Sequence, residues 1–190
     1  MLYATLVFTH VVGAAGLFSA IAIEALSLHR LQQAETPADA RLWLGVLAVP
    51  GRLGPPSMLA TVLSGIAVAA LGWRHQAWMV AALVAVVAMG ALAGGVTRGR
   101  MRILARAIAG ESGPILSGWY RALLARRALE TSLRLRIALG VGILGLMTVK
   151  PGTAGSVLLL AGAAAAGALA SAVAPARRAR PASAEGVSGA

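Results

Sequence analysis

The hydrophobic pattern of the chain consists of long runs that are apolar on every side, separated by segments that carry the charges. A helix rises ~1.5 Å per residue, so about 20 apolar residues cross a hydrocarbon core of about 30 Å. Strands of a membrane barrel would instead alternate between apolar and polar positions. Five runs fit helices: Leu2–Leu28, Pro55–Gly72, Ala77–Val96, approximately Leu133–Val149, and Thr153–Val173. We therefore predict an all-α membrane bundle of five transmembrane helices within residues 1–174.

Composition agrees with this pattern. Of the 190 residues, 58% are hydrophobic and 12% are charged, and the mean hydropathy is +0.80, far from the usage of a soluble domain. The first run has no basic region before it and no small-residue cleavage signal after it, so we expect a retained helix rather than a signal peptide. The chain has no cysteine, which excludes disulfides, thiolate metal sites and cysteine nucleophiles.

The net charge of +11 is kept out of the apolar runs and collected beside them. With five spans, the segments 29–54, 97–132 and 174–190 share one side of the membrane. Together with the arginines that border them, they hold every Lys and Arg except Arg74 and Lys150. The positive-inside rule then predicts an amino terminus outside and a carboxyl terminus in the cytoplasm. Anionic lipid headgroups, rather than nucleic acid, are the expected partner of this charge.

One connecting segment on the basic side is patterned as a short helix. In RLWLGVLAVPG (41–51) we predict an amphipathic helix that lies along the membrane surface and is stopped by Pro50 and Gly51. Pro55 and Pro56 then open the second span, from positions that the start of a helix tolerates.

The second connection, over residues 97–132, is basic and amphipathic. Leucines at helical spacing over 115–140 predict one long helix that runs into the fourth span, with Arg134 and Arg136 reaching back to water. The tail, residues 175–190, combines Pro, Ser, Ala and Arg without periodicity, so we expect it to be disordered in the cytoplasm.

Two ionisable residues, His10 and Glu24, lie in the first span, in the stretch FTHVVGAAGLFSAIAIE. They are 14 residues apart, which is about 1400° of rotation on a helix, ~40° short of four turns, so they share one face. Gly13 and Ala20 stand between them on that face, and Gly16 lies close by, which lets another helix approach closely. The face is therefore predicted to point into the bundle.

Each of these two residues has a structural and a functional interpretation. Glu24 lies near the inner border, so an ion pair with Arg134, Arg136 or Arg52 would anchor helix ends. His10 can be satisfied by a neighbouring hydroxyl or by the backbone. The functional alternatives are a polar path along the face, or a ligand role for His10 at its outer end.

Four possible ligands gather near the outer face: His10, His75, Met79 and Met147. Imidazole with thioether suits reduced copper, and two axial ligands of these types can hold haem iron. Each of the four stands alone on its segment, however, and methionine at helical positions is usually core packing. A haem or copper site therefore stays an alternative to a protein without a cofactor.

The chain also resembles a family of small bacterial integral membrane proteins of unassigned function. The resemblance rests on THVVGAAGLF, VPGRLGPPSMLATVLSG, GWRHQAW and LGLMTVKP, which together span most of residues 1 to 151. The family in turn is similar in outline to the membrane part of copper resistance protein D and to haem-carrying membrane cytochromes. It implies a helical bundle in the bacterial inner membrane. The chain departs from the cytochrome pattern, because no second histidine in the spans clearly pairs with His10.

The predicted function follows from what the chain lacks as well as what it holds. A nucleophile elbow, a phosphate-binding loop, HExxH and paired carboxylates are all missing from the sequence. We therefore expect a non-enzymatic protein that serves the permeation or export of a small solute or ion, or that packs as a subunit of a complex or homo-oligomer. The alternative is a redox or metal-handling protein that binds haem or copper through His10.

Overall fold

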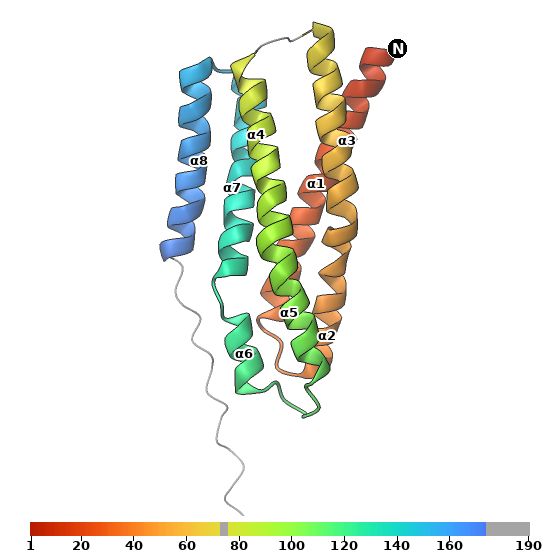
Figure 1. Ribbon diagram of the computed structural model, residues 1–190, viewed down its shortest axis with the longest axis vertical. Helices are drawn as coiled ribbons and strands as arrows, with labels where there is room; N and C mark the ends of the chain where they lie inside the picture. Colours follow the sequence, from red (N-terminus) through yellow and green to blue (C-terminus); the bar gives the residue numbers. More distant parts are fainter. Residues whose placement is uncertain (73–75, 174–190) are drawn as a thin grey trace, which may run out of the picture.

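The computed structural model describes residues 1–72 and 76–173, and every regular element in that part of the chain is helical (Figure 1). The predicted tail, 175–190, lies outside the described residues. In chain order the elements are α1 (Leu2–Leu31), α2 (Pro37–Val46), α3 (Ala48–Gly72), α4 (Ala77–Ala91), the π-helical segment η1 (Leu92–Thr97), α5 (Arg98–Ala109), α6 (Gly118–Leu124), α7 (Ala128–Val149) and α8 (Thr153–Val173).

Five helical stretches in the described part of the chain are long and apolar enough to cross a membrane, as the sequence predicted. They are Leu2–Leu31, Pro37–Gly72, Ala77–Ala109, Gly118–Val149 and Thr153–Val173. Large apolar side chains point away from the bundle on all sides, among them Phe8 and Leu158. Such side chains are stable only against lipid, so the protein is a multi-pass membrane protein whose helices contact lipid.

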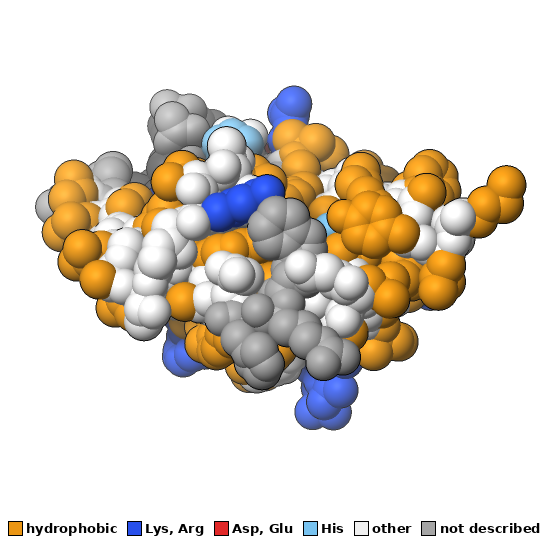
Figure 2. Space-filling view, turned by 90° about the horizontal axis from the view of Figure 1, so that it is seen from above, with side chains coloured by type: hydrophobic (Ala, Val, Ile, Leu, Met, Phe, Trp, Pro, Cys, Tyr) orange, Lys and Arg blue, Asp and Glu red, His pale blue; other side chains and the backbone are white. Residues whose placement is uncertain are grey.

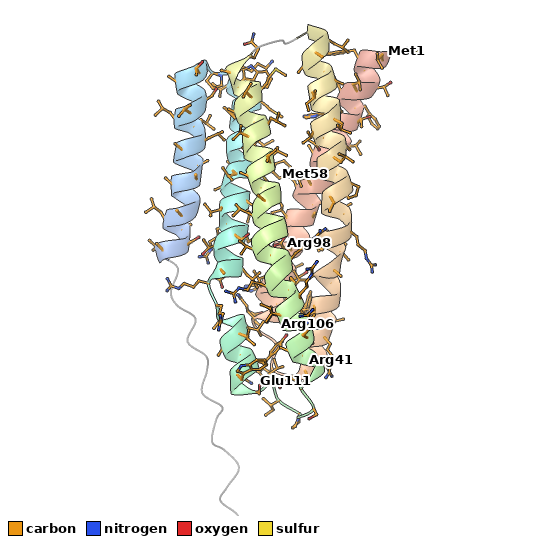
Figure 3. The ribbon with its side chains drawn as sticks, viewed as in Figure 1. Met1, Arg41, Met58, Arg98, Arg106 and Glu111 are labelled. Atoms are coloured by element: carbon orange, nitrogen blue, oxygen red, sulfur yellow. The ribbon has the colours of Figure 1, made fainter. Side chains whose placement is uncertain are left out.

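The helices pack in two groups, α1 against α3 and α7 against α4 and α8 (Figure 1). Glycines permit the closest approaches. A Cβ on Gly13 would lie 2.6 Å from the Thr61 hydroxyl, and one on Gly16 would lie 2.4 Å from the Ser57 hydroxyl. The small-residue face predicted on the first span is therefore the face that packs on α3. Between the two groups, Met58 of α3 reaches α4 where Gly90 leaves room (Figure 3).

The short helices α2, α5 and α6 gather at one end of the bundle, opposite the end at which the chain begins (Figure 1). We call this the basic end, because Arg41 and Arg106 lie there (Figure 3). Arg41 donates to the carbonyl oxygens of Ile108 and Glu111, at 3.3 and 2.7 Å. A cation at these last carbonyls offsets the negative end of the α5 dipole, so α2 is tied to α5.

The predicted stop of the 41–51 helix at Pro50 and Gly51 is wrong. The helix α2 ends at Val46, one residue separates it from α3, and Pro50 lies inside α3. Pro50 is tolerated because it is the third residue of α3, where a backbone N–H has no intrahelical partner. Pro55 and Pro56 likewise lie inside α3 rather than at its start.

The predicted continuous helix over 115–140 is also wrong, because it breaks between Leu124 and Ala128. Tyr120 and Leu124 are buried before the break, and Leu129 and Leu133 are buried after it. Each later residue follows its counterpart by nine positions, which is about 900° on one straight helix and would place the two pairs on opposite faces. The break lets both pairs enter the core.

Candidate functional site

The His10 ring is held against α3 by its Nδ1 atom. Nδ1 lies 2.8 Å from the backbone carbonyl oxygen of Thr61, and the Ser64 hydroxyl lies 3.5 Å from the same nitrogen. Gly65 makes room for the ring, since a Cβ there would lie 3.0 Å from Cε1 and 3.1 Å from Nδ1. Within the described residues no hydrogen bond reaches the other ring nitrogen, Nε2.

A carbonyl oxygen can only accept a hydrogen bond, so the Thr61 contact requires a proton on Nδ1. The Ser64 hydroxyl already donates its hydrogen to the Ala60 carbonyl. Toward Nδ1 it can therefore only act as an acceptor. In a neutral imidazole, one proton on Nδ1 leaves Nε2 with a free lone pair. The geometry fixes one tautomer of His10.

A cavity of about 640 Å³ lies between α1, α3, α4 and α7, and His10 is part of its wall. Its lining is apolar throughout, apart from the side chains of His10, Thr61 and Gln76 and the indole of Trp78. No acidic residue is among the described side chains that line it. The described wall therefore offers the His10 ring no charged partner.

The cavity opens sideways, between helices. Four lining residues are also among the apolar side chains exposed on the outside of the bundle, namely Ile66 on α3, Val80 and Leu83 on α4, and Leu144 on α7. Seen from the end at which the chain begins, the described surface is largely hydrophobic and shows no acidic side chain (Figure 2). An apolar molecule dissolved in lipid would meet an apolar entrance.

The floor of the cavity is apolar and closed. Phe18, Met89 and Gly140 line its lower wall, and a Cβ on Gly140 would lie 2.9 Å from the Phe18 ring. The ring therefore packs directly on the α7 backbone. One helical turn below Gly140 lies Arg136. The polar path that could have joined His10 to Glu24 is interrupted by this layer of side chains.

Below the floor, Glu24 of α1 forms a bidentate ion pair with Arg136 of α7. Arg136 Nη1 donates to Glu24 Oε2 at 2.8 Å, and Nη2 donates to Oε1. Glu24 is 7% and Arg136 4% exposed, so Arg136 does not reach water as the sequence had suggested. A guanidinium can leave water because its planar donors match the carboxylate oxygens in pairs.

Two further donors of Arg136 also have partners. Nη2 donates to the Thr97 hydroxyl at 3.2 Å, and Nε donates to the Ser132 carbonyl at 3.3 Å. The Ser132 hydroxyl lies 3.3 Å from that of Thr97 and 3.4 Å from the carbonyl oxygen of Leu92. Thr97 ends the π-helical segment η1, whose extra residue per turn turns the hydroxyl inward. The group Glu24, Arg136, Thr97 and Ser132 is called the polar lock below.

Arg134, the other expected partner of Glu24, lies on a different side of α7. It forms a partly exposed ion pair with Glu130 at 3.0 Å and donates to the Ala170 carbonyl at 3.0 Å. Among the described residues, Glu24 makes no ion pair with Arg134 or Arg52. The sequence could not choose between the three arginines, because the choice depends on the rotation of α7 about its axis.

Three of the four predicted ligands line one cavity: His10, Met79 and Met147. The fourth, His75, lies outside the described residues. No group of three or more His, Asp or Glu side chains in the described part of the chain could hold a metal ion. The polar residues that complete the site, Thr61 and Ser64, occur in the quoted motif MLATVLSG. In the sequence, the only sign that these two residues could be partners of His10 was that each carries a hydroxyl group.

Comparison with protein-family models, with curated proteins and with solved structures found no match. Of the resemblance that the sequence motifs suggested, the five-helix membrane bundle is the part that the structure supports. The function therefore rests on the geometry of the cavity.

Proposed function

We propose that this protein binds a small, largely apolar solute inside the membrane and serves its permeation or export. The cavity carries the proposal. Its volume of about 640 Å³ and its apolar wall with few polar groups match the usual features of small-molecule sites. Bundles that serve only as packing subunits fill such space with side chains, because protein interiors are close-packed.

The closed floor and the polar lock favour a carrier over an open pore. A solute in the cavity meets Phe18 and then the Glu24–Arg136 pair, so it cannot continue without movement of one helix group against the other. By the positive-inside rule the cavity belongs to the outer half of the membrane and the basic end to the cytoplasmic side. The side entrance between α3 and α4 admits solutes from the lipid.

The test is saturable binding of tritiated 1-naphthol, a small aromatic alcohol, to the purified protein in lipid nanodiscs. We expect one site per chain. Ala14 lines the cavity, whereas its neighbour Ala15 is exposed on the outside of α1. Ala14→Phe should abolish saturable binding by filling the cavity, and Ala15→Phe should retain it. Equal binding by the two variants, or binding that never saturates, would contradict the proposed function.

A second candidate function is haem or copper binding, favoured by the free Nε2 of His10 in a cavity that Met79 and Met147 also line. Imidazole and thioether fit reduced copper or the axial positions of haem iron, and the Thr61 carbonyl would orient the ligand through Nδ1. Bound there, the group would supply electron transfer or metal handling. Visible spectra and metal analysis of the purified protein test this candidate, which requires a stoichiometric signal that His10→Ala removes.

A further inference from the structure

The ligand class that the cavity takes follows from the tautomer of His10, if the cavity is a solute site as proposed above. We infer that the solute is an apolar molecule with one hydrogen-bond donor, such as a phenol or another hydroxyl compound, and that its O–H donates to Nε2 of His10. A carbonyl, an ether or a quinone of the same shape lacks the donor that Nε2 requires.

The first step of this inference is the direction of the hydrogen bond at Nδ1. The Thr61 oxygen is a backbone carbonyl 2.8 Å away, and the Ser64 hydroxyl hydrogen is engaged by Ala60. Both neighbours accept from Nδ1, so the single proton of the neutral ring is committed there. Gly65 leaves room for the ring in this orientation, since a Cβ there would lie 3.0 Å from Cε1 and 3.1 Å from Nδ1.

The second step is the absence of competing groups around Nε2. Within the described residues, the cavity wall offers Nε2 no donor at hydrogen-bond distance. Thr61 donates its hydroxyl hydrogen to the Ser57 carbonyl at 2.8 Å, so that proton is available neither to Nε2 nor to a solute. Apart from Thr61, Gln76 and the indole of Trp78, the rest of the described wall is apolar. A solute that cannot satisfy Nε2 therefore leaves a buried polar atom unpaired, which discriminates between solutes.

The third step is the shape of the solute. Toward the floor, the described lining includes Leu17, Phe18, Val86, Met89 and Ile143, all of which are apolar. A molecule with a second polar end would have to bury it against these side chains, which is costly. One donor at one end of an apolar body satisfies Nε2 and places no polar group against these side chains.

The test compares 1-naphthol with 1-methoxynaphthalene as competitors of tritiated 1-naphthol in nanodiscs. We expect the methyl ether to compete about tenfold more weakly, the loss of one hydrogen bond to a buried acceptor. His10→Phe, which keeps an aromatic ring without the acceptor, should remove this difference while the ether binds as before. Equal competition by the two compounds in the wild type would overturn the inference and leave the proposed cavity function intact. Failure of 1-naphthol to bind saturably would overturn the cavity function itself.

A measurement on the unaltered His10 keeps the inference testable if His10→Phe does not fold. In a His29→Gln, His75→Gln background, ¹⁵N NMR of labelled histidine reports His10 alone. We expect a protonated Nδ1, an unprotonated Nε2, and a shift of Nε2 on addition of 1-naphthol but not of 1-methoxynaphthalene. A proton on Nε2, or haem or copper bound to it in the purified protein, would overturn the inference, because no lone pair would then face the solute.

Discussion

His10 and Glu24 stand on the same face of the same helix, yet their surroundings differ in kind. The carboxylate of Glu24 is fully engaged by Arg136, whose other donors reach Thr97 and Ser132. His10 is engaged at one nitrogen only, beside a cavity of about 640 Å³. A polar group whose partners all come from the protein holds helices together, whereas one that lacks a partner next to open space is positioned for a ligand.

Of the variants that distinguish the two regions, Glu24→Gln is expected to lower the stability most. It leaves the Arg136 guanidinium buried without a countercharge, so unfolding in denaturant titrations should become easier by about 3–5 kcal/mol. The matched control is Glu130→Gln, which breaks the partly exposed i,i+4 pair with Arg134 and should cost about 0.3–0.5 kcal/mol. Similar losses from the two variants would mean that the buried pair is not a structural lock.

His10 is held in position by the packing of α1 on α3. The second largest loss of stability is expected for Gly13→Ala, which disturbs this packing. The added Cβ would lie 2.8 Å from the backbone nitrogen of Thr61, so the helices must separate. We expect a loss of about 1–3 kcal/mol, as for other overpacked cores. Gly162→Ala is the control, because nothing lies within 4 Å of a Cβ there, and it should be neutral or stabilising. A neutral Gly13→Ala would show that this contact is loose.

A smaller effect is expected for Thr97→Val, which keeps the volume of the side chain and removes the hydroxyl that accepts from Arg136. The loss should be about 1 kcal/mol, typical of one hydrogen bond. Combined with Glu24→Gln, the two losses should not add, because both variants act on the same guanidinium. Strict additivity in the double mutant would indicate that Thr97 acts elsewhere.

The smallest effect concerns the loop between α5 and α6, at the basic end. Hydrogen bonds from the side chain and backbone of Ser117 lower the pKa of Glu111 from its ordinary value of 4.5. A lowered pKa stabilises the folded loop above pH 4.5, and this contribution is lost as the pH falls through the folded-state pKa. Protection of the Ser117 amide against exchange, measured relative to the unstructured rate at the same pH, should therefore fall on acidification below pH 4.5. In Glu111→Gln this pH step should vanish.

The sequence predicted the large features because they depend on long apolar runs. It gave wrong predictions where tertiary packing overrides local helix periodicity. The five spans and the close approach at Gly13 and Gly16 followed from composition and helical spacing. The helix break before Ala128 did not, because it arises from burying Tyr120 and Leu129 in the same core. The partner of Glu24 was narrowed to three arginines, and only the packing of α7 selects Arg136.

The candidate site was predictable only in part for a similar reason. His10, Met79 and Met147 could be named as residues near the outer face, and the structure places all three in one cavity wall. The cavity itself, however, is a volume left between four helices, and no residue pattern encodes a volume. The tautomer of His10 likewise depends on the Thr61 carbonyl, a backbone atom that carries no sequence signal.

The measurement that most directly tests the contrast between the two regions is saturable 1-naphthol binding by a pair of variants in nanodiscs. One is Ala14→Phe, which fills the cavity. The other is the double variant Glu24→Leu, Arg136→Met, which replaces the ion pair by apolar side chains and should remain folded. We expect binding to be lost in the first and kept in the second. Binding that survives Ala14→Phe but disappears with the ion pair would place the site at the polar lock and contradict the assignment to the His10 cavity.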